Sequence, residues 1–449
     1  TLASMFVFEG SVSSFYQNLV DGTASHLEHK HIDLGGRKRE DPAPVHLTKI
    51  TRSWKSLMNA DFLWLSLKMK FSYIEDIPTP CYVVDTGRLE QNARTIHHVQ
   101  EETGAKVILA LKGFAMFSVF GALKKYLFGT TASSVHEARL GREEFGGEVH
   151  AYAPAYSDAD IEALLPMVDH ITFNSFSQLE RYREQVRVYP KPPSVGLRIN
   201  PEYSEIKTPL YDPCRPNSRL GMTCEQCKGQ SLIGVEGLHF HTMCEQNADT
   251  LERTLEVVEE KFGSMIPQMK WINFGGGHHI SRSDYDVERL CRIIQGFCKR
   301  HPQCQVYLEP GEAIALHAGV LVASVLDVFE ASMPMAILDV SATAHMPDVL
   351  EMPYRPLIRG GGEPGAKPFT YRLGGLTCLA GDEIGDYAFD QPLKVGDRLI
   401  FEDMAHYTMV KNTAFNGVPL PSIAIHDSEA ETYQIVRSFD YHDYRNRLS

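Results

Sequence analysis

The sequence has no run that approaches the ~20 consecutive apolar residues of a membrane-spanning helix. It also lacks a basic surplus, because 44 Lys and Arg stand against 57 Asp and Glu, which gives a formal net charge of -13. Nucleic-acid backbones are bound by concentrated basic surfaces, so this balance argues against a nucleic-acid partner. A moderate acidic excess mainly keeps a protein soluble, and it is compatible with a cationic substrate.

Cysteine is scarce in this chain and is scattered along it. The nine cysteines have an odd count, and the close pair Cys224 and Cys227 has no second Cys or His pair nearby at zinc-ligand spacing. We therefore expect free thiols, a reducing compartment and no metal centre. The first thirty residues also lack the basic start and apolar run of a secretory signal, so we expect a cytoplasmic protein.

The length and the hydrophobic pattern predict an α/β protein with two domains behind an N-terminal extension. Single domains seldom exceed ~250–300 residues, so 449 residues suit a large barrel and a second domain. Residues 1–73 form the extension, and the sequence leaves open whether it folds. Residues 74–316 alternate short apolar runs with helical stretches, which favours a (β/α)8 TIM-like barrel. Residues 317–449 turn to β-branched runs and turn residues, which indicates a β-rich C-terminal domain.

Polar residues recur where the candidate barrel strands end. Barrel enzymes place their sites at the carboxyl ends of the strands, so we expect Lys112, Ser134 and Arg198 to face the site. A lone lysine after a strand is usually a solvated surface residue. Lys112 closes an apolar run, however, and a desolvated amine has the lowered pKa that Schiff-base chemistry needs. The candidate strands are Cys81–Asp85, Val107–Lys112, Thr131–Ser134, His150–Ala153, His170–Asn174, Val195–Asn200, Gly237–His241, Trp271–Gly275 and Val306–Glu309.

Further strand ends carry groups that fit a phosphorylated, electron-accepting ring. Gly275, Gly276 and Gly277 leave a bare backbone that can approach a phosphate, although a tight turn is the more common reason for such a run. Glu309 can keep a ring nitrogen protonated, or it can belong to a buried ion pair. His241 can stack on a cofactor ring, whereas a hydrogen-bonded core histidine is the more common fate.

Several motifs in one fixed order carry a resemblance to a known family. From about residue 77 to residue 423 the chain resembles the fold-type-III decarboxylases that use pyridoxal 5'-phosphate (PLP), the alanine-racemase-like group. Within this group the motifs are most similar to those of carboxynorspermidine decarboxylases. The motifs are Leu109–Met116, Ala132–Arg139, Gly237–Asn247, Asn273–His279, Leu308–Ala313, Ser341–Asp348, Gly374–Cys378 and Asp403–Tyr407.

The resemblance implies PLP as the cofactor and assigns roles to single residues. Lys112 would hold PLP as a Schiff base, and Glu309 would partner the pyridine nitrogen. Cys378 would be the second catalytic residue, which reaches across a homodimer interface and donates the proton that replaces CO2. Most free cysteines, by contrast, are small buried hydrophobes. The cofactor contacts implied are Lys112, Ser134, Glu137, Arg198, His241 (stacked on the ring), Gly275, Gly276, Gly277 (around the phosphate), Glu309 and Tyr407 (at the phosphate).

The residue after the Glu-Pro-Gly motif bears on the substrate. Related decarboxylases carry arginine there, whereas this chain has Glu312. A carboxylate suits an ammonium or a secondary amine better than a second carboxylate, which points away from diaminopimelate and toward a polyamine tail. The resemblance then implies decarboxylation of carboxynorspermidine to norspermidine and of carboxyspermidine to spermidine. Asp348 and Asp382 are further candidates for amine contacts, although helix caps and turn residues look the same in sequence.

Three alternatives stay open. The nearest is another decarboxylase on the same scaffold, acting on diaminopimelate, ornithine or arginine. A non-catalytic PLP-binding protein would need only the barrel, and it would have no use for a second domain that carries Cys378 and Tyr407. A racemase would need a second acid or base, for which the sequence has no clear tyrosine motif.

Overall fold

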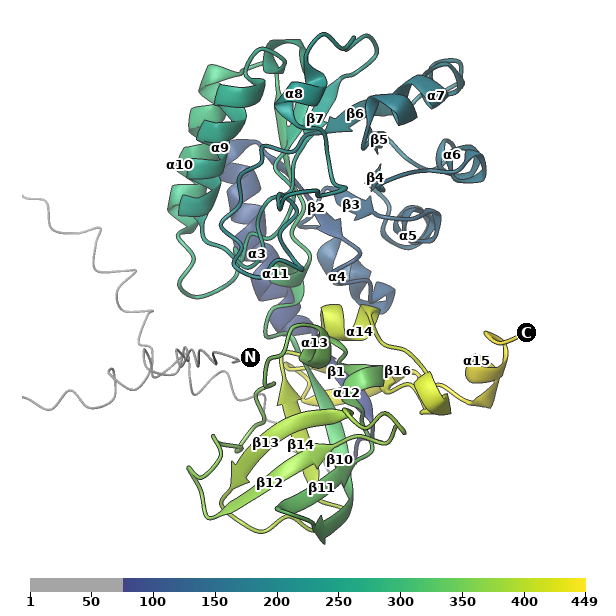
Figure 1. Cartoon of the computed structure of the whole chain (residues 1–449), viewed down its shortest axis with the longest axis vertical. Coiled ribbons are helices and arrows are strands. Elements are labelled where there is room, and N and C mark those ends of the chain that lie inside the picture. The colour runs from purple at the N-terminus through teal and green to yellow at the C-terminus, as the bar shows by residue number, and fades with distance from the viewer. Residues whose placement is uncertain (1–75) are drawn as a thin grey trace, which may run out of the picture. The chain divides into compact units, whose positions relative to one another are not determined.

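The computed structural model describes residues 76–449, which all belong to one compact unit (Figure 1). The predicted extension, residues 1–73, lies outside the described residues. The described part contains a closed parallel barrel and a separate mixed sheet. The predicted α/β class, with a barrel and a β-rich second domain, is therefore confirmed.

Eight parallel strands close the barrel in chain order, and β2 pairs with β9 to complete the ring. Alternate residues of a barrel strand face opposite sides. Val107 and Leu109 of β2 join the core that the barrel shares with its helices, whereas Ile108 packs with Trp271 and Tyr307 in a separate cluster. The strands are β2 (Lys106–Ala110), β3 (Gly129–Ala132), β4 (Glu148–Tyr152), β5 (His170–Phe173), β6 (Ser194–Arg198), β7 (Gly237–His239), β8 (Trp271–Asn273) and β9 (Gln305–Leu308).

Several helices of the barrel begin at a serine that closes a strand or loop. Ser134, Ser157 and Ser175 each accept a hydrogen bond from a backbone N–H of the first helical turn. In Figure 1 the helices α5, α6 and α7 lie outside the strands β3 to β6. The helices are α3 (Thr86–Thr103), α4 (Phe120–Leu123), α5 (Val135–Leu140), α6 (Asp158–Leu164), α7 (Phe176–Arg187), α8 (Cys224–Cys227), α9 (Ala248–Phe262), α10 (Val287–Arg300) and α11 (Glu312–Ala315).

The second domain is an eight-stranded mixed sheet with the order β13-β12-β11-β10-β1-β15-β16, in which β14 also pairs with β10. The strands are β1 (Cys81–Asp85), β10 (Gly319–Glu330), β11 (Pro334–Leu338), β12 (Phe369–Gly374), β13 (Glu383–Phe389), β14 (Arg398–Glu402), β15 (Ser422–Asp427) and β16 (Thr432–Arg437). Short helices join or follow them: α12 (Ala342–His345), α13 (Asp348–Glu351), α14 (Tyr407–Val410) and α15 (Tyr441–Arg445).

Strand β1 is not the barrel strand that the sequence predicts. It pairs antiparallel with β10 and parallel with β15, in the middle of the second sheet. Every residue of β1 is buried, with Tyr82 in one core cluster and Val83 in another. A central strand of a mixed sheet and a strand of a parallel barrel are both covered on two faces, so their apolar runs look alike in sequence. The sheet therefore takes one strand from within the range predicted for the barrel, residues 74–316.

Candidate functional site

Lys112 lies just beyond the end of β2, at the carboxyl end of the barrel. Its side chain is accessible to solvent although protein surrounds it, as expected for a residue that lines an open site. Burial lowers the pKa of the Lys112 amine, and Arg198 lowers it further, while Glu309 opposes them. The pKa of Lys112 therefore lies below the ordinary value of lysine, which makes the neutral, nucleophilic form of the amine more accessible.

Glu309 follows β9 and is held through both carboxylate oxygens. Oε1 accepts a hydrogen bond from Asn273 Nδ2 (2.8 Å), and Oε2 lies 3.5 Å from His239 Nε2. Burial by itself would raise the pKa of Glu309, but His239, His150 and Lys112 together bring it below its ordinary value. Glu309 is therefore an ionised carboxylate in a largely buried place, which can hold a proton on a ring nitrogen.

The glycine run forms a bare turn between β8 and the segment that follows it. Gly275 and Gly277 have φ values of +72° and +83°, which favour glycine. A Cβ atom on Gly276 would lie 2.3 Å from the carbonyl oxygen of Glu309, and one on Gly277 would lie 2.0 Å from that of Met243. Side chains are therefore excluded, which leaves a backbone surface of the kind that accepts a phosphate.

His241 and Arg198 lie beside these groups. The backbone N–H of Gly276 donates to His241 Nδ1 (3.0 Å), so the ring proton of neutral His241 is on Nε2. Burial, Lys112 and Arg198 all lower the pKa of His241, which keeps its ring neutral. The Arg198 guanidinium lies 4.5 Å from the ring centre of Tyr152, and its Nη2 donates to the carbonyl of His241 (3.4 Å).

Ser134 and Glu137 lie at the start of α5. Ser134 Oγ caps this helix by accepting from the backbone N–H of Glu137 (3.2 Å), and Glu137 Oε2 accepts from the backbone N–H of Ser133 (2.6 Å). Burial raises the pKa of Glu137, while Ser133 and Lys112 lower it. Glu137 is thus electrostatically coupled to Lys112, whereas the contact found for the Ser134 hydroxyl is the helix cap.

An acidic rim lies beside these groups and consists of Glu312, Glu245 and Asp403. Glu312 is the first residue of α11. Glu312 Oε2 lies 3.3 Å from His279 Nε2, and Oε1 lies 3.8 Å from His406 Nδ1. Burial and the Glu312 carboxylate raise the pKa of Glu245. Burial lowers the pKa of His406, but Asp403, Glu312 and Glu245 outweigh this and raise it to about 9. A region that stabilises a proton in this way also attracts other cations.

Tyr407 and Asp348 come to the site from the sheet domain. Burial and Glu312 raise the pKa of Tyr407, the first residue of α14, so its hydroxyl stays a hydrogen-bond donor. Asp348, the first residue of α13, already accepts from Tyr211 (3.1 Å) and pairs with the ammonium of Lys411. Its charge is therefore neutralised within the chain.

Asp382 and Cys378 belong to the loop between β12 and β13. The buried carboxylate of Asp382 accepts from Ser341 Oγ, from Thr377 Oγ1 and from the backbone N–H groups of Thr343 and Thr377. Asp382 thus fastens the loop that carries Cys378. Cys378 is exposed, and its backbone N–H donates to the Asn416 side chain (2.7 Å).

The structure adds Asn273, His239 and Glu245 to the residues that the sequence indicates. Asn273 and His239 contact Glu309 directly, and Glu245 lies at the acidic rim. All three fall inside the motifs that carry the family resemblance, so their place in those motifs was the available signal. Their sequence positions alone could not show which side chains meet.

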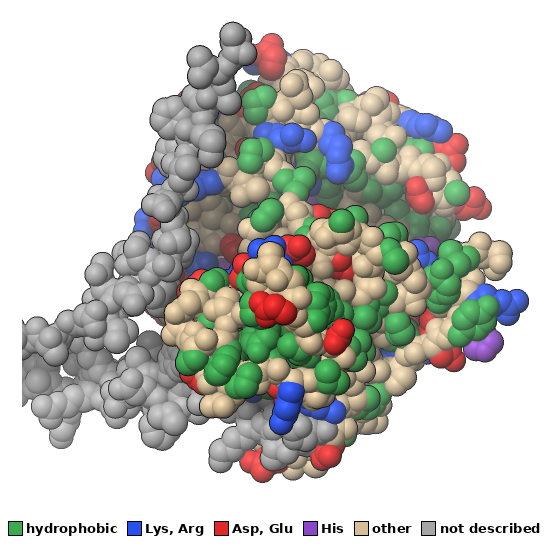
Figure 2. Space-filling view, turned by 60° about the horizontal axis from the view of Figure 1, so that its bottom comes forward, with side chains coloured by type: hydrophobic (Ala, Val, Ile, Leu, Met, Phe, Trp, Pro, Cys, Tyr) green, Lys and Arg blue, Asp and Glu red, His purple; other side chains and the backbone are tan. Residues whose placement is uncertain are grey.

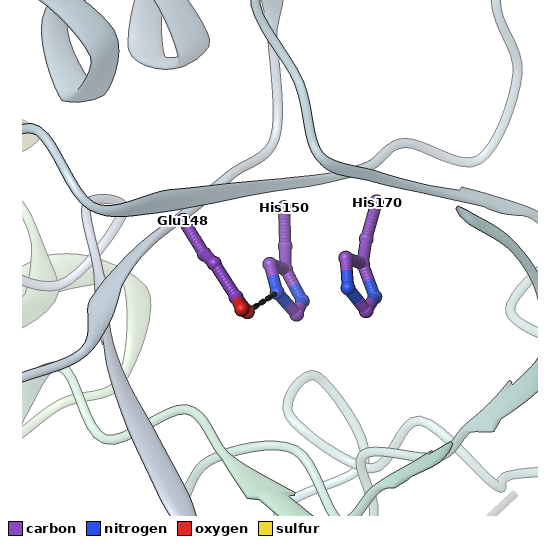
Figure 3. Close-up of side chains that lie close together, drawn as sticks. All are labelled: Glu148, His150 and His170. Atoms are coloured by element: carbon purple, nitrogen blue, oxygen red, sulfur yellow. Dashed lines mark hydrogen bonds and ion pairs between the residues drawn. The ribbon is translucent and has the colours of Figure 1, made fainter. Parts of the chain in front are cut away.

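A second polar cluster lies on the barrel strands β4 and β5 (Figure 3). Glu148 and His170 are the first residues of these two strands, and His150 is the third residue of β4. One ligand atom from each lies within 4.8 Å of the others. The two imidazole rings are stacked at 3.9 Å with an interplanar angle of 8°, and Lys106 Nζ lies 2.7 Å from Glu148 Oε1. Parallel rings aim their lone pairs in parallel, and an ammonium already neutralises the carboxylate. We therefore interpret this cluster as a structural network.

No helix in residues 76–449 has the length and apolar character needed to cross a membrane.

Known proteins are similar to this chain in sequence and fold. Residues 73–405 match the family model described as "Pyridoxal-dependent decarboxylase, C-terminal sheet domain". The carboxyaminopropylagmatine decarboxylase of Synechocystis is 49% identical over 84% of this chain and 96% of that protein. The carboxynorspermidine/carboxyspermidine decarboxylase of Campylobacter jejuni is 43% identical over 84% of this chain and all of that protein. The crystal structure of carboxynorspermidine decarboxylase from Campylobacter jejuni, complexed with norspermidine, superposes with a TM-score of 0.77 at 42% identity, over 83% of this chain and 100% of that one.

Proposed function

The chain belongs to the pyridoxal-dependent decarboxylases, and on that premise we propose that it decarboxylates carboxynorspermidine to norspermidine and carboxyspermidine to spermidine. The observation that carries the substrate proposal is the acidic rim around Glu312, next to the strand ends that carry Lys112 and Glu309. Carboxylated polyamines combine the α-amino acid group that such chemistry needs with a tail of cationic amines. An acidic rim attracts that tail.

The residues at the strand ends fit PLP. The glycine turn would receive the phosphate, with Tyr407 as a further donor, while His241 would stack on the ring and Arg198 would hold His241 through its carbonyl. Bound there, PLP supplies the electron sink that the loss of CO2 requires. The amine of Lys112, with its lowered pKa, would bond the cofactor, and the ionised Glu309 would hold a proton on the pyridine nitrogen. Ser134 and Glu137 would complete the wall beside Lys112.

Glu312 is the residue that we propose as the contact for a substrate amine. Of the three candidates from sequence, Glu312 is the one whose ion-pair partners among the described residues are histidines only, His279 at 3.3 Å and His406 at 3.8 Å, with no set of hydrogen bonds that occupies its carboxylate. Asp348 is paired with Lys411, and Asp382 accepts bonds from its own loop. These contacts support a structural role for Asp348 and Asp382.

We further propose a homodimer in which each site receives Cys378 from the other subunit as the proton donor to the substrate carbon. Figure 2 shows hydrophobic side chains gathered on the face that it brings forward. Leu376, Leu379 and Phe415 are exposed hydrophobic side chains close to Cys378 in sequence or joined to its loop through Asn416. The test mixes Lys112→Ala and Cys378→Ala subunits after mild dissociation. Recovery of up to about a quarter of the normal activity, against none in either variant, supports shared sites, since hybrid dimers would carry one complete site.

The nine cysteines are all free thiols, which supports the proposal that the protein works in the reducing cytoplasm. Cysteine accessibility measured in intact cells tests this.

CO2 release with a substrate panel tests the activity. Purified protein with PLP is incubated with carboxynorspermidine, carboxyspermidine, diaminopimelate, ornithine and arginine. We expect release from the first two, and we expect Glu312→Arg to weaken these substrates selectively. Preference for diaminopimelate by the wild-type protein, or an unchanged preference in Glu312→Arg, would overturn the substrate proposal.

A second candidate substrate is carboxyaminopropylagmatine, which the 49% identity to the Synechocystis enzyme favours. Its tail ends in a guanidinium group, which a carboxylate such as Glu312 can bind through two parallel hydrogen bonds. Including it in the panel separates the two candidates by their kcat/KM values.

A further inference from the structure

Asn273, the last residue of β8, lies between two parts of the proposed cofactor site. Its side chain is buried, with 3% exposure. Nδ2 donates to Glu309 Oε1 (2.8 Å), and Oδ1 accepts from the backbone N–H of Gly275 (2.8 Å). A carboxylate can only accept and a backbone N–H can only donate, so these two partners fix the orientation of the amide.

The bond to Gly275 shapes the glycine turn. A side-chain oxygen that accepts from the N–H two residues later forms an Asx turn, which Asn favours. The turn begins where Gly275 takes up its positive φ of +72°. The backbone N–H of Glu309 also donates to the carbonyl of Gly275 (2.8 Å), so Glu309 and the turn are joined twice, once through the backbone and once through Asn273.

We propose that Asn273 is a positioning residue that fixes the carboxylate of Glu309 and the glycine turn relative to one another. This inference rests on the cofactor site proposed above, in which the turn receives the phosphate and Glu309 receives the pyridine nitrogen. A rigid ligand that touches both ends binds tightly only if the distance between them is already set.

The amide is chemically suited to this place, whereas a carboxylate is not. Asp at position 273 could keep the bond to the Gly275 N–H, but it would lose the donor to Glu309. It would also place a second carboxylate beside Glu309, and like charges at such a distance raise one pKa strongly. The two carboxylates would then compete to take up one proton, so the full negative charge of Glu309 would no longer be assured beside the ring nitrogen.

The test compares the variants Asn273→Asp, Asn273→Ser and Asn273→Ala with the control Asn200→Asp. Asn200 is also buried, follows the barrel strand β6, and bonds Leu220 and Glu202 without touching Glu309 or Gly275. The first readout is the dissociation constant of PLP, titrated by absorbance with the purified apo protein. The second is the split between kcat and KM.

Asn273→Asp and Asn273→Ser should raise the dissociation constant of PLP about ten- to hundredfold, as expected for a hydrogen bond to a charged group. With saturating PLP, Asn273→Asp should lower kcat and leave KM for the substrate unchanged, whereas Asn200→Asp should change neither PLP affinity nor kcat. Affinity for PLP that stays within threefold of wild type in the Asn273 variants overturns the inference, as does an equal loss in Asn200→Asp. Failure of the wild-type protein to bind PLP overturns the proposed cofactor site itself, which is a distinguishable result.

Discussion

Lys106 and Lys112 lie at the two ends of one barrel strand and have opposite surroundings. Lys106 begins β2, and its Nζ lies 2.7 Å from Glu148 Oε1 and 3.4 Å from the Tyr307 hydroxyl. Lys112 follows the same strand, is accessible to solvent and makes no hydrogen bond to any described residue. The protein that surrounds its amine lowers the pKa of that amine by desolvation. The amino end of this strand thus pairs its lysine, whereas the lysine at the carboxyl end, where barrel enzymes place their sites, has no hydrogen-bond partner among the described residues.

The carboxylates at the two ends differ in the same way. Glu148 accepts hydrogen bonds from Lys106, Tyr307 and His150, all on the barrel strands. Glu309 is held by Asn273 and His239 but faces the site of Lys112. A buried polar group supports stability where all its partners belong to the protein, as for Glu148. Where one partner is left to a ligand, as proposed for Glu309, the same kind of group can serve catalysis.

Lys112→Ala should give the largest effect and should act on activity alone. Turnover should fall on the order of 10³-fold or more, and the visible absorption band of the bound cofactor should vanish, since no other amine replaces it. Thermal unfolding of the apo protein should change little. Lys106→Ala is the matched control, and it should lower stability while folded protein keeps its kcat. An equal loss of activity in both variants would show that the two ends of the strand do not differ in this way.

Trp271→Ala should give the largest loss of stability. Trp271 fills the barrel interior so closely that a Cβ atom on Gly237 would lie 2.0 Å from its ring, and its Nε1 donates to Ser194 Oγ (2.8 Å). Removing the ring should lower the free energy of unfolding by about 3–5 kcal/mol. Urea unfolding measures this, with Phe329→Ala, an exposed side chain, as the control. A loss of less than about 1 kcal/mol would show that Trp271 is not tightly packed in the barrel interior.

The Glu148 network should make stability depend on acid pH. Burial would raise the pKa of Glu148, but His150, Lys106 and Tyr307 bring it down from an ordinary 4.5 to about 2. A carboxylate with a depressed folded-state pKa stabilises the protein above its unfolded pKa. The contribution is lost as pH falls through the window from about 4.5 to about 2, and it amounts to about 3 kcal/mol. Chemical unfolding curves across this pH range should show the loss in wild type and a flatter profile in Glu148→Gln.

Glu312→Gln should give the smallest effect of these variants. It should change substrate binding at the carboxyl end of the barrel and not the stability of the fold. Removing one charge from the acidic rim should raise KM for a carboxylated polyamine about three- to tenfold and leave kcat unchanged, because the contact would be equal in ground and transition states. Steady-state kinetics at low salt measures this, and added salt should shrink the difference. A fall in kcat with constant KM would place Glu312 at the reacting centre instead of the tail.

Sequence motifs indicated the proposed site residues but not the contacts that these residues make. Lys112, Glu309 and the glycine run follow apolar strands, and the structure brings them to one end of the barrel. Asp348 and Asp382 were indicated by charge alone, and the structure shows both carboxylates bound within the chain. Asp348 pairs with Lys411 and accepts from Tyr211 of the barrel, and Asp382 accepts from Ser341 of its own domain. A carboxylate near a site reads the same in sequence whether its partner is a substrate or a neighbouring side chain.

The sequence by itself determined the barrel, the β-rich second domain and the residues at the strand ends, because alternating apolar runs and strand-closing polar residues are local patterns. Only the tertiary structure decided that β1 belongs to the second sheet, since its pairing with β10 and β15 joins segments far apart in the chain. It also decided the partners of Lys106, Asn273 and Asp382. Hydrogen bonds and ion pairs depend on distances across the fold, which no local pattern encodes.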